Sequence, residues 1–243
     1  MEVIINVFII VLVYLIPLIA FARNTKWRSY SKPINILISI AYIIMIFVLP
    51  SMQTNILPFI LIIIMIIKMK RNTYLRDDYY SYKFSLNDFS LTNAFKYAAF
   101  GYGIVFAISL ISQIILKLLN FQLEQQEVVN VLASYDILKF LLAAPSAVIF
   151  APIVEEYVFR YVLFSKLLRG KFKGKLGFVI SSIIVSLIFA TVHYNLAALG
   201  MLFAISFYNC YLIEKRGFWY AVFNHFFVNM ITTTLLFISK LIQ

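Results

Sequence analysis

The sequence predicts an all-α fold, that of a polytopic integral membrane protein with about eight transmembrane helices. Composition is the first reason, because 63% of the 243 residues are hydrophobic, whereas a soluble domain is about 45–50% apolar. Second, the apolar residues fall in runs close to the roughly 20 residues that a helix needs to cross a bilayer. Third, basic residues gather between these runs. No linker or internal repeat divides the sequence, so residues 1–243 form one predicted membrane domain.

Eight apolar runs define the predicted spans. In chain order they are Val3–Ala22, Pro33–Pro50, Met52–Ile67, Tyr97–Leu116, Leu138–Phe164, Gly177–Val192, Leu196–Ile213 and Phe218–Ile238. The third run is short and can form a hairpin with the second through Ser51–Asn55. The first run lacks the basic flank and the small-residue cleavage site of a signal peptide, so we expect it to be a membrane helix.

The basic residues predict the orientation of these spans. Most of the 21 lysines and arginines lie in four loops, which follow the first, third, fifth and seventh spans. With eight spans these loops share one side, which the positive-inside rule makes cytoplasmic, and both termini are extracytoplasmic. The net charge of +11 then comes mostly from the cytoplasmic loops, which can attract the anionic headgroups of membrane lipids. Without a Gly-rich phosphate loop or an aromatic-basic RNA motif, we expect no nucleic-acid partner.

Two longer loops separate the spans. Residues 68–96 mix tyrosines with lysines and arginines, which is typical of a segment at the cytoplasmic membrane surface, with a substrate-facing segment as the alternative. Residues 117–137 are acidic, and the spacing of their apolar residues allows a surface helix. The single cysteine, Cys210, excludes an internal disulfide and is interpreted as a small apolar helix residue.

Three charged residues stand inside the fifth predicted span, namely Glu155, Glu156 and Arg160. A charge at bilayer depth costs about 2.5–3.5 kcal/mol even on the lenient insertion scale. Glu156 and Arg160 are one helical turn apart and can pair, which would hold this helix in register. Glu155 is rotated by about 100° and stays available for other contacts. The competing interpretation is a buried ion pair that only locks helices together.

Two prolines precede these charges in the same span. Pro152 lacks the N–H that would bond the Val148 carbonyl, and both Pro145 and Pro152 favour a kink. A kink beside buried acids can open a pocket that water reaches. We therefore expect such a pocket next to Glu155.

The only two histidines also fall in or beside predicted spans. His193 follows the sixth span. His225 lies in the eighth, one helical turn before Asn229, so the imidazole and the amide share a face. A lone membrane histidine most often hydrogen-bonds another helix. Here polar groups come from three segments, and their burial is best explained if they converge on one wet cavity.

His193 raises a geometric problem for that convergence. At about 1.5 Å per residue, it lies some 27 Å along a straight helix from Lys175, whereas Glu155 lies only about 16 Å from Lys166. If the two side chains meet, the sixth helix must tilt or begin outside the hydrocarbon. We therefore expect the start of this span to differ from Gly177.

The polar residues form three motifs, Glu155-Glu156-Tyr-Val-Phe-Arg160, Phe189-Ala-Thr-Val-His193 and His225-Phe-Phe-Val-Asn229. Their order and spacing resemble the CPBP family of intramembrane proteases, also called the CAAX-protease or Abi (bacteriocin-processing) family. Its pattern is Glu-Glu-x-x-x-Arg, Phe-x-x-x-His and His-x-x-x-Asn. The resemblance covers about residues 145–230. The family includes type II CAAX prenyl endopeptidases and bacterial members linked to bacteriocin immunity and peptide processing.

This resemblance implies an intramembrane endopeptidase that cuts a membrane-associated peptide or protein. Residues 1–135 would be accessory or anchoring helices, and residues 136–240 the catalytic helices. Peptide hydrolysis needs an activated water, a stabiliser for the oxyanion and an acid for the leaving amine. In this mechanism Glu155 is the expected general base, and His193 contacts the same water and later donates a proton. His225 and Asn229 are the expected hydrogen-bond donors to the oxyanion. Glu156 and Arg160 are expected to support the site structurally.

A metal site is the alternative mechanism. Glu155, His193 and His225 can also form a ligand set for zinc or another divalent metal, with an open position for water. The His-Glu-x-x-His motif is absent, and the metal-free mechanism is the better supported one in the family. We therefore expect no cofactor.

Two other function classes stay open. One is a non-enzymatic membrane immunity or regulatory protein that binds a partner. The other is a proton-coupled transporter, since buried glutamate and histidine also mark proton relays; the lack of an inverted repeat and of paired broken helices argues against it.

A composition rich in Ile, Asn, Lys, Phe and Tyr points to a bacterial source, and so to a bacterial plasma membrane.

Overall fold

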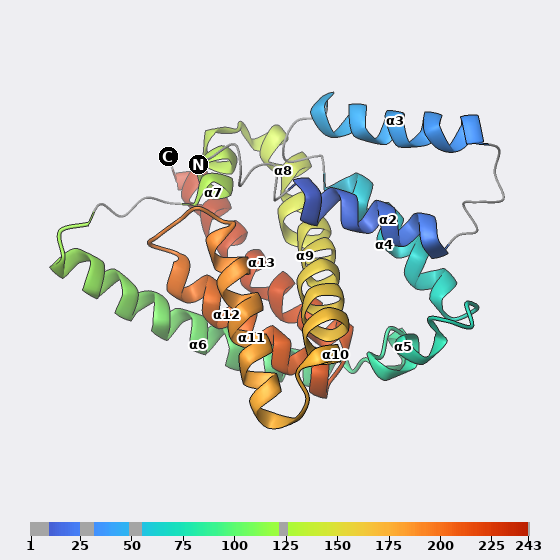
Figure 1. The fold of residues 1–243 in the computed structure, drawn as a ribbon. Helices are drawn as coiled ribbons and strands as arrows, with labels where there is room; N and C mark the ends of the chain where they lie inside the picture. The colour runs from blue at the N-terminus through green and yellow to red at the C-terminus, as the bar shows by residue number, and fades with distance from the viewer. Residues whose placement is uncertain (1–9, 25–31, 49–54, 122–125, 243) are drawn as a thin grey trace.

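The computed structural model describes residues 10–24, 32–48, 55–121 and 126–242, and every regular element within them is helical (Figure 1). The predicted all-α class is therefore confirmed. In chain order the helices are η1 (Ile10–Leu15), α2 (Ile16–Asn24), α3 (Lys32–Val48), α4 (Ile56–Met69), α5 (Arg76–Ser81), η3 (Leu86–Asp88), α6 (Leu91–Leu118), α7 (Glu127–Ser134), α8 (Ile137–Pro145), η4 (Ser146–Phe150), α9 (Ala151–Glu155), η5 (Glu156–Leu168), α10 (Arg169–Lys171), α11 (Gly174–Thr191), α12 (Leu199–Lys215) and α13 (Phe218–Ile242). Here η3 is a 3-10 turn, and η1, η4 and η5 are π-helical. The start of the predicted first span and most of the predicted hairpin Ser51–Asn55 lie outside the described residues.

Four helices are long and apolar enough to cross a membrane, judged by length and composition over the described residues. They are α6, the unbroken helix Ile137–Lys171 that runs from α8 to α10, α11 and α13. Helix α4 and the segment Leu12–Ala22 are apolar but shorter, and α12 has 17 residues. The chain fits a polytopic membrane protein, whereas the predicted count of eight spans is not confirmed.

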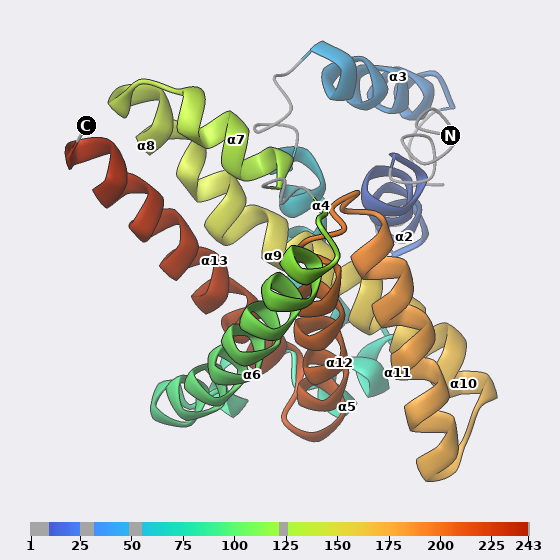
Figure 2. The same cartoon turned by 90° about the vertical axis from the view of Figure 1, so that its left-hand side faces the viewer.

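The helix Ile137–Lys171, hereafter the central helix, runs through the middle of the bundle. Helices α11, α12 and α13 pack beside it, and α6 packs against α12 and α13 (Figures 1 and 2). On the other side, α4 packs against α2 and the central helix. Helix α3 lies across one end of the bundle in both views. Its Tyr42 hydroxyl donates a hydrogen bond of 3.0 Å to the Tyr14 carbonyl of η1.

The polar segment 68–96 is docked onto the bundle by its aromatic and acidic side chains. Phe84 is buried, and its ring centre lies 4.6 Å from that of Phe218 at the start of α13. Asp78 accepts a hydrogen bond of 2.9 Å from the Tyr161 hydroxyl on the central helix. The segment therefore joins two of the helices that carry motifs, while its place at the membrane surface stays a prediction.

A helix is present within the acidic loop 117–137, as its pattern allowed. The apolar side of α7, including the buried Leu132, packs against α8 and the end of α13. Asp136 caps α8, because its carboxylate accepts the backbone N–H of Lys139 at 2.8 Å. This hydrogen bond lowers the pKa of the exposed Asp136 carboxyl below its usual value.

Candidate active site

The two adjacent carboxylates lie in different environments, in line with their rotation about the helix. Glu156 is fully buried, whereas 20% of the Glu155 side chain is exposed. The predicted ion pair is present, since Arg160 Nε lies 3.1 Å from Glu156 Oε2. The buried guanidinium also lies 4.1 Å from the centre of the Phe189 ring, a cation–π distance. Arg160 therefore compensates the charge of Glu156 and leaves Glu155 for other contacts.

Glu156 is also bonded from two other helices. Its Oε1 accepts a hydrogen bond of 3.0 Å from Asn209 Nδ2 on α12 and lies 2.8 Å from His225 Nδ1 on α13. Because a carboxylate only accepts hydrogen bonds, the Nδ1 atom of His225 must carry a proton. Sequence reasoning missed Asn209. The only available signal was a carboxamide inside the apolar run Leu196–Ile213.

The second nitrogen of His225 faces the other carboxylate. Its Nε2 lies 3.8 Å from Glu155 Oε2, which is too long for a direct hydrogen bond. Among the described residues, Glu155 Oε2 has no hydrogen-bond partner. The two atoms are near enough to contact the same water molecule.

His193 lies in the turn that follows α11. Its Nδ1 is 2.7 Å from the Phe189 carbonyl oxygen, which can only accept, so this nitrogen carries the proton in the neutral ring and Nε2 is left as acceptor. Tyr194 turns the chain with a φ of 50°, and the Asn195 side chain accepts the Ala198 N–H at 2.7 Å. The sixth helix begins at Gly174 rather than Gly177, so it starts further toward the basic loop.

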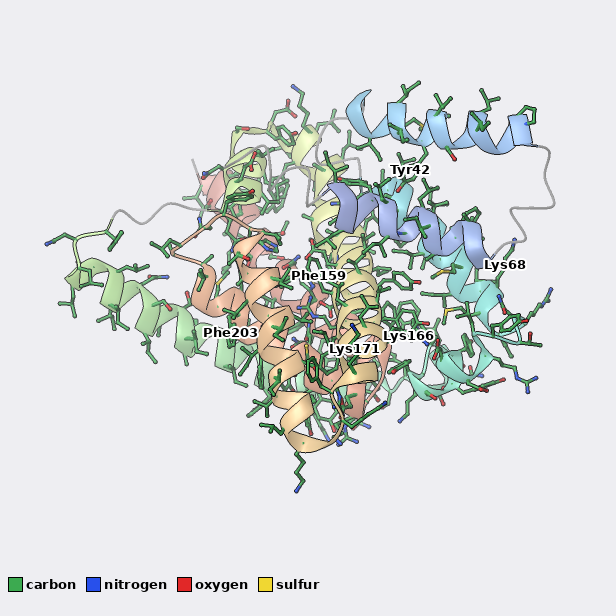
Figure 3. All side chains as sticks on the ribbon, viewed as in Figure 1. Tyr42, Lys68, Phe159, Lys166, Lys171 and Phe203 are labelled. Carbon is green, nitrogen blue, oxygen red and sulfur yellow. The ribbon has the colours of Figure 1, made fainter. Side chains whose placement is uncertain are left out.

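Glu155 and His193 line one cavity of about 100 Å³. Its other walls are apolar and come from Phe159, Val192, Leu12 and Val13; Figure 3 places Phe159 in the middle of the bundle. A water molecule occupies about 30 Å³ in the liquid, so the cavity has room for water and a small chemical group. Leu12 and Val13 belong to η1, and this helix therefore forms part of the cavity wall.

Asn229 lies on the same helix as His225 but contacts the backbone of the central helix. Its Nδ2 donates to the Ala147 carbonyl at 2.9 Å. In the π-helical turn η4, the Ala151 N–H bonds the carbonyl five residues back, that of Ser146. The next bond in this register would join residue 152 to Ala147, but Pro152 has no N–H. One N–H of the Asn229 amide thus replaces the bond that the proline cannot make.

Replacing Asn229 by leucine is expected to lower the free energy of unfolding by about 1–2 kcal/mol, because a partly buried carbonyl loses its donor. In a Pro152→Ala background a backbone N–H returns at position 152, and the same replacement should then destabilise the protein less. Thermal unfolding of the four proteins in detergent micelles measures both effects. Equal losses in the two backgrounds would contradict this role.

The arrangement does not resemble a metal centre. Over the described residues, no group of three or more His, Cys, Asp and Glu side chains could hold a metal ion. His193 and His225, the imidazoles of the alternative ligand set, use Nδ1 in hydrogen bonds to the protein, which leaves Nε2 as the nitrogen that could bind a metal. As placed, these two side chains and Glu155 do not form such a three-ligand group, and we derive no step through a metal.

The fold and site define a helical membrane protein with a buried acid–imidazole centre supplied by three parts of the bundle. Residues 137–231 match the family model described as type II CAAX prenyl endopeptidase Rce1-like, and all three motifs fall within them. This match supports the CPBP family that the motifs predicted. Comparisons with curated proteins and with solved structures found no match. Because the family consists of membrane-embedded proteases, it supports a CAAX-type intramembrane peptidase activity in general terms.

Proposed function

We propose that this protein is an intramembrane endopeptidase that hydrolyses a peptide bond in a membrane-associated peptide or protein, without a metal ion. One observation carries the proposal. Glu155 and His193 line the same small cavity, and His225 Nε2 lies 3.8 Å from Glu155. A carboxylate and two imidazoles beside a space for water are the groups that general acid–base hydrolysis needs.

Glu155 is the proposed general base. Its carboxylate would take a proton from a water molecule while the water oxygen attacks the carbonyl carbon of the peptide. The nitrogen of His193 that is not bonded to Phe189 would accept a hydrogen bond from the same water and orient it. Since Arg160 pairs with Glu156 and not with Glu155 in the contacts described, the Glu155 carboxylate is left free of the guanidinium and can contact the water.

Negative charge then develops on the former carbonyl oxygen. His225, when protonated on both nitrogens, would donate its Nε2–H to this oxyanion while Glu156 holds the Nδ1–H. The second amide N–H of Asn229, the one not given to Ala147, is the proposed further donor. When the C–N bond breaks, the proton taken from water passes through Glu155 or His193 to the leaving nitrogen. The products are a carboxylic acid and a free amine.

The test is hydrolysis by the purified protein in liposomes. A synthetic library of membrane-associated peptides, incubated in water enriched in ¹⁸O, is expected to give new carboxyl termini that carry the label in mass spectra. A chelator should leave the rate unchanged. Loss of the rate with chelator and its return on adding zinc would establish the metal alternative. A folded protein that yields no labelled termini would favour the non-enzymatic membrane protein instead.

A further inference from the structure

A chain of buried amides leads from α6 to the candidate active site. Asn224 Nδ2 on α13 donates to Asn209 Oδ1 on α12 at 2.7 Å, and Asn209 Nδ2 donates to Glu156 Oε1 at 3.0 Å. All three side chains are fully buried. Because the Asn209 oxygen is taken by Asn224, the Asn209 amide must present its N–H groups to the carboxylate.

The oxygen that Asn209 contacts is the one that holds His225. Oε1 of Glu156 lies 2.8 Å from His225 Nδ1, while Oε2 lies 3.1 Å from Arg160 Nε. Without the Asn209 N–H, the guanidinium is the strongest remaining partner of this carboxylate, and arginine favours binding both oxygens at once. Asn209 therefore opposes a rotation of Glu156 that would release the imidazole.

At the far end of this chain of amides, a glycine leaves the room that the Asn224 side chain occupies. A Cβ atom added at Gly101 of α6 would lie 2.2 Å from Asn224 Oδ1 and 2.8 Å from a ring carbon of Tyr208. Helix α6 packs against both α12 and α13 (Figure 2). A side chain at Gly101 would have to displace the Asn224 amide. Gly103, two residues further along the same helix, has no atom within 4 Å of its added Cβ.

We propose that Asn209 and Asn224 are positioning residues that act on His225 through Glu156. This hydrogen-bonded relay keeps the proton of the neutral His225 ring on Nδ1 and turns its Nε2 toward Glu155. Gly101 is required for the relay because it leaves room for the Asn224 amide. The effect of the relay on peptide hydrolysis rests on the proposed function, whereas its effect on the tautomer of His225 does not. The relay makes α6, which contributes no motif, a part of the site.

Nitrogen NMR of the ¹⁵N-histidine-labelled protein tests the relay, since the chain has only two histidines. In the wild type at high pH, His225 is expected as the Nδ1–H tautomer. Asn209→Leu and Gly101→Ala should each give a mixture of tautomers at His225 and leave His193 unchanged, because the latter is held by the Phe189 carbonyl. Gly103→Ala, with the same change in helix propensity, should leave both signals as in the wild type.

Activity and folding controls separate the possible outcomes. Peptide cleavage should fall about tenfold in kcat for Asn209→Leu and Gly101→Ala, with little change in KM, which is the usual scale for residues that orient a functional histidine. Gly101→Ala should have a smaller effect on kcat in an Asn224→Ala background, because the amide that it displaces is gone and only the contact with Tyr208 remains. If Gly101→Ala does not fold, the apolar pair Asn209→Leu/Asn224→Leu provides the same test of the tautomer.

An unchanged His225 signal in folded Asn209→Leu would overturn the relay. Equal effects of Gly101→Ala and Gly103→Ala would overturn the part assigned to Gly101. If the variants change the tautomer of His225 but even the wild-type protein cleaves no peptide, the relay is supported and the proposed function is rejected.

Discussion

Glu155→Gln is expected to lower kcat for peptide hydrolysis by about 10²–10⁴-fold, the usual contribution of a general base. Glutamine has nearly the same size but cannot take a proton from water. The folded state should be little affected, because Glu155 Oε2 has no hydrogen-bond partner among the described residues and the side chain is partly exposed. Initial rates in liposomes, with a peptide selected from the library, measure the loss.

The matched control for this variant is Glu127→Gln, which makes the same change at an exposed glutamate of α7. Its rate should equal that of the wild type. A Glu155→Gln protein that still cleaves at the wild-type rate would show that another group activates the water. The assignment of the base would then be wrong even if the chain is a protease.

Arg160→Met is expected to lower the free energy of unfolding by about 3–5 kcal/mol, because it leaves the buried Glu156 carboxylate without its cation. The Glu156→Gln/Arg160→Met double variant should recover part of this loss, since the unpaired charge is then removed as well. Unfolding in detergent, followed by circular dichroism, measures the three stabilities.

An exposed ion pair on the central helix serves as the control. Lys139 Nζ lies 3.4 Å from Asp136 Oδ2, and most of both side chains is exposed. Lys139→Ala should change stability little, because solvent screens such pairs. If Arg160→Met were no more destabilising than Lys139→Ala, Arg160 would not be the counter-ion on which the arrangement of Glu156 depends.

The convergence of the motifs was predictable from the high free-energy cost of burying charged groups. Glu155, Glu156 and Arg160 could not face lipid, and the histidines were the remaining partners with suitable chemistry. The amides of Asn209 and Asn224 were not predictable in this way. They are neutral, they lie in apolar helices, and a separation of 15 residues across two helices has no periodicity that would indicate contact.

Asn229 shows how far a shared helix face can guide a prediction. His225 and Asn229 both reach the central helix, as their spacing of four residues requires. One turn of α13 nevertheless separates their partners, which are the Glu156 carboxylate and the Ala147 carbonyl. The face was thus predictable, but the partner of Asn229 depended on the π-helical turn before Pro152, which periodicity does not reveal.

The number of spans was the least predictable feature of the fold. Hydropathy alone marks eight runs, but α4 and α12 have only 14 and 17 residues, and α3 lies across the bundle in both views. Composition cannot separate a short span from an apolar helix that is buried or lies along the bundle end. The contribution of Leu12 and Val13 to the cavity beside Glu155 had no signal in a uniformly apolar segment.

The most direct test of the central claim is a rate measurement on Glu155→Gln, His193→Gln and the variant that combines them. If Glu155 and His193 act on the same water molecule, their losses should not multiply, and the combined variant should cleave about as slowly as the slower single variant. A combined loss equal to the product of the two single losses would contradict a shared water, and so would a wild-type rate in either single variant.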